Sequence, residues 1–122
     1  EMIYLWGIED YWKGRRVPTQ ETYDQIAGKR NIIAITHNPD TVLTAPDGIS
    51  VLLAGHSHGG QVNVPIFGPY PLVNDPRFMK GEAAVDGKHV FVTSGVGCTG
   101  PQIRFRVPPD IAVVTLQART AS

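Results

Sequence analysis

Two short apolar segments, each followed by histidine, constrain the fold of this chain more than any other feature. Asn31–Thr36 (NIIAIT) and Ser50–Ala54 (SVLLA) are nearly continuous apolar runs, the pattern typical of strands covered on both faces. His37 directly follows the first run, and Pro39 disfavours its continuation. The second run leaves through the glycine-rich segment Gly55–Gly60. The chain is therefore expected to be an α/β protein with histidines at the ends of two buried strands.

The rest of the chain predicts more strand than helix. A helix is expected over Thr19–Ile26, with Thr19 as its N-cap and Gly28 as its stop. Residues 40–48 have room for one helical turn, and Phe67–Met79 is expected to be an irregular loop. Further strands are expected over Met2–Ile8, Gln61–Ile66, His89–Thr93, Ile103–Val107 and Ile111–Leu116. One helix cannot cover two faces of so many strands, which predicts a strand-rich α/β domain that lacks part of its cover.

Composition excludes several classes of protein. Hydrophobic residues make up 42% of the 122 residues and charged residues 18%, which is typical of a globular domain. Eleven basic residues balance eleven acidic ones, so a broad nucleic-acid surface is not expected. Cys98 is the single cysteine, which excludes an intrachain disulfide and indicates a small side chain in a glycine-rich loop. No apolar run approaches the ~20 residues of a membrane span.

Three of the four histidines are predicted to be metal ligands. Side chains two residues apart in an extended segment point the same way, so His56 and His58 can face one point. His37 leaves its own strand by the same logic, and neighbouring strands would bring all three imidazoles to one edge of the sheet. A His-x-His pair alone also occurs by chance, and His89, which opens a later strand, is predicted to be an exposed surface residue.

Several motifs resemble one known family. They are THNPD (36–40) and LLAGHSHGGQV (52–62), supported by GIEDYWKG (7–14), VPIFGPYP (64–71), VFVTSGVG (90–97) and PQIRFRVPPDIAVVTL (101–116). Together they resemble the C-terminal half of the calcineurin-like metallophosphoesterases. The similarity is greatest to the bacterial branch with membrane-associated phosphodiesterases and UDP-diacylglucosamine pyrophosphohydrolases. The resemblance implies that residues 1–122 are the C-terminal part of a single domain, the strand-rich half of an α/β/β/α sandwich.

The resemblance also implies a function. In such families the histidines matching His37 and His56 bind one metal ion, and the histidine matching His58 binds a second. Two divalent ions, Mn, Fe or Zn, would then promote hydrolysis of a phosphodiester, phosphomonoester or pyrophosphate bond. The expected substrate is a phosphorylated small molecule or a lipid-linked one. The expected location is the bacterial cytoplasm or the membrane periphery.

The chain departs from the family in one respect. The family's remaining ligands come as an Asp-x-His, a GDxxD with a bridging aspartate, and an Asn-His, and none of these occurs here. The N-terminal half of the domain is therefore expected to be absent, and the catalytic residues stay unknown. The chain alone is expected to be inactive and to hold at most one ion, weakly. Apolar surface left uncovered is expected to favour a homodimer.

Five polar residues are candidates for supporting a ligand or lining the substrate cleft. Asp10 is more simply a turn or capping residue. Asp40 is expected to cap the turn after it, and a hydrogen bond to the neighbouring histidine is the alternative. Asn38 lies between that histidine and Asp40. Gln61 and Asn63 follow the histidine loop and either line the cleft or form an ordinary exposed strand face.

Other residues and functions stay open. Arg104 and Arg106 share one face, which favours a solvated or salt-bridged surface over phosphate binding. Phe67 and Tyr70 are candidates for packing on a lipid-like or nucleotide substrate. The alternative to an enzyme is a non-catalytic metal-binding or interaction domain that uses the same three histidines. A structural oligomerisation module would make those histidines incidental.

Overall fold

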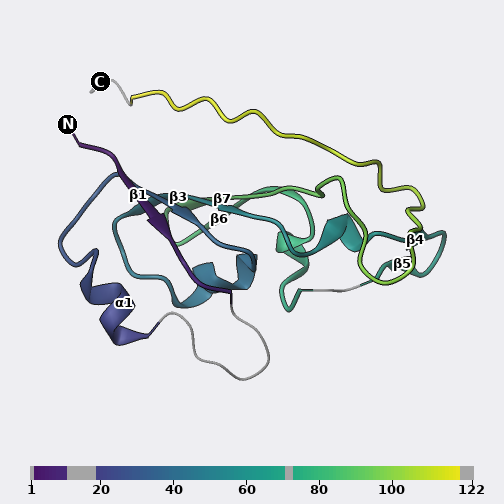
Figure 1. The fold of residues 1–122 in the computed structure, drawn as a ribbon, viewed down its shortest axis with the longest axis horizontal. Helices are drawn as coiled ribbons and strands as arrows, with labels where there is room; N and C mark the ends of the chain where they lie inside the picture. Colours follow the sequence, from purple (N-terminus) through teal and green to yellow (C-terminus); the bar gives the residue numbers. More distant parts are fainter. Residues whose placement is uncertain (1, 11–18, 71–72, 119–122) are drawn as a thin grey trace.

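The part of the chain that the structure describes forms one five-stranded sheet and a small two-stranded one (Figure 1). The computed structural model describes residues 2–10, 19–70 and 73–118. The main sheet has the order β1-β2-β3-β7-β6, formed by Tyr4–Gly7, Ile32–Ile35, Ile49–Ala54, Lys88–Val92 and Gly81–Val85. Its first four strands run parallel, and β6 pairs antiparallel to β7. The small sheet pairs β4 (Asn63–Val64) with β5 (Gly68–Pro69).

Helical structure is short. The described helices are α1 (Gln20–Asp24) and three 3₁₀ turns: η1 (Pro39–Thr44), η2 (His58–Gly60) and η3 (Pro76–Phe78). The predicted N-cap of α1 is confirmed, because the Thr19 hydroxyl accepts a hydrogen bond from the Thr22 amide. Gly28 follows with a φ of 72°, which glycine adopts without strain and which turns the chain toward β2.

The core lies on one face of the sheet. Ile32, Ala34 and Leu52 are fully buried there, beneath Val42 of η1 and Phe78 of η3. In Figure 1, α1 and η1 lie on one side of the strands, and the C-terminal segment runs along the other. Burial alternates along β2 because successive side chains point to opposite faces.

The opposite face is largely uncovered, as expected for two apolar runs whose cover on both faces this chain has too little helix to provide. Ile35 of β2 is 46% exposed, and Leu5 of β1 is 71% exposed. Over β3 and β7 a groove of about 590 Å³ separates the sheet from residues 112–116. A homodimer through this apolar face stays a prediction, as does the absence of part of the domain.

Three of the expected strands differ from the structure. Ile111–Leu116 is not a strand, because no neighbouring strand among the described residues pairs with its backbone; Ile111 and Val113 are 85% and 91% exposed. Ile103–Val107 contributes only an isolated bridge between Phe105 and Val62. The strand expected over Gln61–Ile66 is reduced to the two residues of β4. Strand propensity needs a ladder partner to become a strand, and the sequence does not show whether one is present.

Strand β6 was not expected from the sequence. It forms a hairpin with β7, and the two connecting residues, Asp86 and Gly87, have φ values of 49° and 75°. Positive φ at both positions is the hairpin turn that Asp-Gly favours. The Asp-Gly pair was thus a usable signal for a strand on each side of it.

The strand-rich α/β class is confirmed by a mostly parallel sheet with few helices. Residues 11–14 of the segment GIEDYWKG and residue 71 of VPIFGPYP lie outside the described residues. Phe67–Met79 is irregular apart from β5 and η3, with residues 71–72 likewise outside. No helix among the described residues is long and apolar enough to cross a membrane.

The core makes a direct prediction about stability. Phe78 is fully buried, so Phe78→Ala should lower the free energy of unfolding by about 3–5 kcal/mol, through lost burial and the cavity left behind. Chemical denaturation measures the change. Phe67 is 86% exposed, so Phe67→Ala should change the same quantity by less than about 0.5 kcal/mol. Equal losses in the two variants would contradict the placement of the core.

Candidate metal centre

Parallel pairing brings the carboxyl ends of the strands to one edge of the main sheet. Hydrogen bonds continue past the strands there: the Gly55 amide donates to the His37 carbonyl at 3.2 Å, and the Thr93 amide donates to the Ala54 carbonyl at 2.9 Å. The segments that follow β2, β3 and β7 are thereby held side by side. Ligand sites of open parallel sheets lie at this edge.

Two of the predicted ligands meet at this edge. His56 Nδ1 lies 3.0 Å from His37 Nε2, and the two ring centroids are 4.8 Å apart at an interplanar angle of 71°. One nitrogen carries the proton and the other accepts it, so the pair shares one hydrogen bond. His37 is exposed and His56 half-buried.

His58 faces other partners. Its Nδ1 lies 3.3 Å from the Gly97 carbonyl, and its Nε2 lies 2.7 Å from the Thr99 hydroxyl. The structure thus brings His37 and His56 together and turns His58 to the loop after β7. Within residues 2–10, 19–70 and 73–118, no three His, Cys, Asp or Glu side chains form a group that could hold a metal ion. Whether all three histidines bind metal stays a prediction.

The histidine loop has an unusual backbone. His56, His58 and Gln61 all have positive φ, at 68°, 48° and 47°. Such conformations cost side-chain-bearing residues free energy and persist where the surroundings enforce them, commonly at functional sites. The sequence shows the glycines of this loop but not that the histidines themselves adopt left-handed conformations.

Ser57 and Gly59 explain how the loop is held. Ser57 is fully buried; its hydroxyl donates to the Met79 carbonyl and accepts from the Gly59 amide. A Cβ on Gly59 would lie 2.6 Å from Val107 Cγ1 and 2.7 Å from Ser94 Oγ, closer than real contacts allow. Close approach of the backbone therefore requires glycine there.

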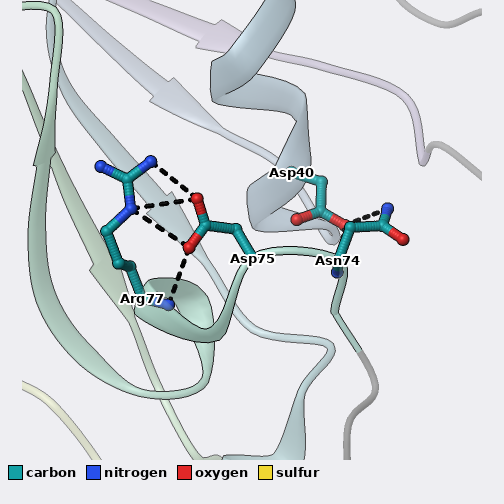
Figure 2. Close-up of polar contacts among 4 residues, drawn as sticks. All are labelled: Asp40, Asn74, Asp75 and Arg77. Carbon is teal, nitrogen blue, oxygen red and sulfur yellow. Dashed lines mark hydrogen bonds and ion pairs between the residues drawn. The ribbon is translucent and has the colours of Figure 1, made fainter.

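Asn38 and Asp40 position the turn after β2 (Figure 2). The prediction that Asp40 caps the turn is wrong: Asn38 is the N-cap, and its Oδ1 accepts from the Asp40 amide at 2.9 Å. An asparagine one residue earlier reaches that amide, which leaves the Asp40 carboxylate free for a distant partner. Asp40 Oδ2 accepts from the backbone amide and the side-chain amide of Asn74, at 3.1 and 2.8 Å. Asp40 thus anchors a distant loop to η1.

Figure 2 also shows the ion pair that follows Asn74. Asp75 caps η3, and Arg77 Nη2 donates to its Oδ2 at 2.6 Å. The side-chain hydrogen bond from Arg77 holds the pKa of Asp75 below its ordinary value. Because the pair is at the surface, it contributes little to stability, but it shapes the turn that presents the Met79 carbonyl to Ser57.

The other polar candidates have separate positions. Asp10 is exposed beyond β1. Gln61 is buried, and its amide binds the 99–101 segment: Oε1 accepts from the Thr99 amide at 2.7 Å, and Nε2 donates to the carbonyls of Thr99 and Pro101. Asn63 begins β4 and its amide donates to the Phe105 carbonyl. Gln61 lines a groove of about 510 Å³ next to His58, and Asn63 does not.

Several partners of the site were missed in the sequence. Gly97 and Thr99 contact His58, although nothing in the pattern GVGCTG marks them as its partners. Arg104 is half-buried and donates to backbone carbonyls, so the prediction that both arginines form a solvated or salt-bridged face is wrong for it. Arg106 and Cys98 are exposed. His89 is exposed as well, which confirms its prediction.

Asp110 closes the loop after β7. Its carboxylate accepts from the Thr93 hydroxyl and from the amides of Ser94 and Gly95. The hydrogen bond from Thr93, helped by those amides and by the charge of Arg104, holds the pKa of Asp110 below its ordinary value. Asp110 therefore ties the C-terminal segment to the site edge in its ionised form.

The chain is similar to curated bacterial proteins over most of its length. It is 31% identical over 121 residues to YkuE of Bacillus subtilis strain 168, an uncharacterized metallophosphoesterase, covering 95% of this chain and 41% of that protein. It is 32% identical over 116 residues to the phosphodiesterase YaeI of Escherichia coli strain K12, covering 92% and 40%. An uncharacterized metallophosphoesterase of Aquifex aeolicus is 32% identical over 112 residues, covering 87% and 41%.

These similarities show that the chain belongs to the metallophosphoesterase family, and the contact between His37 and His56 at the ends of β2 and β3 agrees with this. It spans about two-fifths of the length of the relatives it matches. No family model matches the chain, and no solved structure matches it.

The Asp110 contacts predict a dependence on pH. A carboxylate with a lowered folded-state pKa stabilises the fold above its unfolded pKa, and this contribution is lost as pH falls through the folded value. Protection of the Ser94 and Gly95 amides from hydrogen exchange should therefore drop as pH falls below ~4. In Asp110→Asn the protection should already be low at neutral pH. Unchanged protection in that variant would contradict the role of the carboxylate.

Proposed function

We propose that the protein of which this chain forms part hydrolyses phosphoester bonds with divalent metal ions, and that the chain supplies His37, His56 and His58 as ligands. The observation that supports this most is the contact between His37 and His56 at the ligand-binding edge of the sheet. Membership of the family implies dependence on divalent metal. When bound, such ions activate water and neutralise the charge of the phosphoryl oxygens.

The paired histidines fit an ion in spacing and in chemistry. Two nitrogens each ~2.1 Å from a tetrahedral ion lie ~3.4 Å apart, and His37 Nε2 and His56 Nδ1 are 3.0 Å apart. A shift of a few tenths of an ångström and loss of the shared proton would let both lone pairs face one ion. Neutral imidazoles suit Mn, Fe and Zn, without choosing sharply among them.

The remaining ligands are proposed to come from outside the 122 residues. The chain holds no Asp-x-His, GDxxD or Asn-His sequence, and so no carboxylate in the pattern that bridges two ions in the family. His58 is proposed to serve the second ion, with its ring already oriented by Gly97 and Thr99. The chain by itself is then expected to bind one ion weakly, through His37 and His56, and to be inactive.

The groove beside His58 supports an apolar group in the substrate. Phe67, Pro69 and Tyr70 line it together with Val62 and Val64. The polar atoms of Gln61 at its edge are already engaged with the 99–101 segment, so a nucleobase would find few partners there. Thr99 lies in the lining and also contacts His58. We therefore propose a phosphoester that carries an alkyl chain.

Replacing either paired histidine tests the ligand assignment. In the whole-length protein, His37→Ala and His56→Ala should each lower kcat/KM for bis-p-nitrophenyl phosphate with Mn²⁺ by more than the ~10–100-fold that loss of an outer hydrogen-bond partner costs. His89→Ala is the control, since His89 is exposed on β7 away from this edge. Metal binding without turnover in the unaltered protein would instead favour a non-catalytic metal-binding domain.

The groove is tested with two substrates that differ only in chain length. Phe67→Ala should lower kcat/KM for dodecyl p-nitrophenyl phosphate by at least about 10-fold, because burial of a phenylalanine contributes about 1.5–3 kcal/mol. The methyl ester should be hydrolysed at an unchanged rate. Ile66 is fully exposed next to Phe67 and does not line the groove, so Ile66→Ala is the matched control. Equal effects on both esters would contradict the groove as an alkyl site.

A further inference from the structure

A single arginine holds the loop that follows β7. Arg104 Nη2 donates to the carbonyls of Ser94 at 2.7 Å, Gly95 at 3.1 Å and Gly97 at 2.6 Å, and Nε donates to Gly97 at 3.1 Å. Nη1 donates to the Val107 carbonyl at 3.3 Å. The guanidinium therefore donates to four carbonyls, and three of them belong to the short segment Ser94–Gly97.

That segment has few contacts of its own at Gly97, although Gln61 holds the backbone of Thr99 two residues further on. Gly95 has a φ of 64°, and a Cβ on Gly95 or Gly97 would meet nothing within 4 Å. Val96 between them is 67% exposed. Asp110 binds the beginning of the segment, at Ser94 and Gly95, but does not reach Gly97. Arg104 therefore fixes the Gly97 carbonyl directly, between the anchors at Ser94–Gly95 and at Thr99.

The Gly97 carbonyl is also the partner of His58. A carbonyl oxygen only accepts, so a hydrogen bond in this contact requires the ring proton on His58 Nδ1. In the neutral ring Nε2 then has the lone pair, and the Thr99 hydroxyl donates to it at 2.7 Å. The hydrogen bond at one ring nitrogen thus decides which nitrogen is available to a ligand.

We propose that Arg104 is a positioning residue for His58. Through the Gly97 carbonyl it holds His58 in the Nδ1–H tautomer, which leaves the lone pair on Nε2, where a metal ion would replace the Thr99 hydroxyl. Metal-binding histidines generally donate their second ring proton to a carbonyl or carboxylate, and that partner sets ring orientation and basicity. The inference deepens the proposed function and rests on it for the metal, but the tautomer can be measured without metal.

A guanidinium is required for this role. Its planar fork reaches several acceptors at once and stays charged, whereas an ammonium is a compact point charge with three donors. Arg106, two residues further on, provides the contrast: it is exposed, and its guanidinium carbon lies 5.8 Å from the centroid of the Phe105 ring. Arg106→Gln therefore removes the same charge as Arg104→Gln but leaves the contacts of the segment Ser94–Gly97 in place.

The test measures the His58 tautomer by nitrogen-15 NMR of the imidazole rings in the metal-free 122-residue chain. The unaltered chain and Arg106→Gln should show His58 protonated mainly at Nδ1. Arg104→Gln should lower the Nδ1–H fraction by at least about twofold, because the carbonyl that favours this proton is no longer held. Arg104→Lys should fall between them. The amide resonances of β3 and β7 show whether each variant is folded. If Arg104→Gln does not fold, the tautomer in Arg104→Lys provides the test.

An unchanged His58 tautomer in the folded Arg104 variants would overturn the inference. A shift in Arg106→Gln as large as in Arg104→Gln would overturn it as well. A titration with Co²⁺ separates this result from the proposed function. If Co²⁺ shifts the resonances of none of the three histidines in the unaltered chain, the ligand assignment fails while the tautomers still decide the role of Arg104. In the whole-length protein, loss of Arg104 should weaken Co²⁺ binding by ~10–100-fold.

Discussion

The parallel pairing of β2, β3 and β7 is the constraint on which the candidate site depends. Ala34 pairs with Leu52, and Leu53 pairs with Phe91, so the three strands end together. Side chains alternate between the faces of a strand, and a slip by one residue would turn every one of them over. With this register the buried side chains face the core, and the segments that carry His37, His56 and the 93–99 loop emerge beside one another. The register that buries the apolar side chains therefore also determines where these polar segments lie.

The site edge is held by backbone groups more than by ion pairs. Ser57 binds a backbone carbonyl, Gln61 binds the 99–101 backbone, and Arg104 binds carbonyls of the loop after β7. Such bonds fix loops that have little apolar packing of their own. The strained conformations of His56 and His58 persist inside this framework.

Much of the architecture was predictable because it follows from local patterns. The apolar runs predicted β2 and β3, Thr19 predicted the start of α1, and the histidines at strand ends predicted the edge at which two of them meet. Errors occurred where structure depends on a partner. Ile111–Leu116 has strong strand propensity but no paired neighbour among the described residues. The N-cap of η1 is Asn38 and not Asp40, whose carboxylate instead binds Asn74, 34 positions away.

The sequence by itself determined the class of the protein, the order of its four parallel strands along the chain and the family it belongs to, because periodicity, turn residues and motifs are local properties. Tertiary structure alone decided which face of the sheet is covered, which histidines meet, and which backbone and side-chain groups contact the ring of His58. Those outcomes depend on contacts between residues about 20 to 40 positions apart, such as His37 with His56 and His58 with Gly97. No local pattern specifies the distance between such residues, since only the packed sheet brings them together.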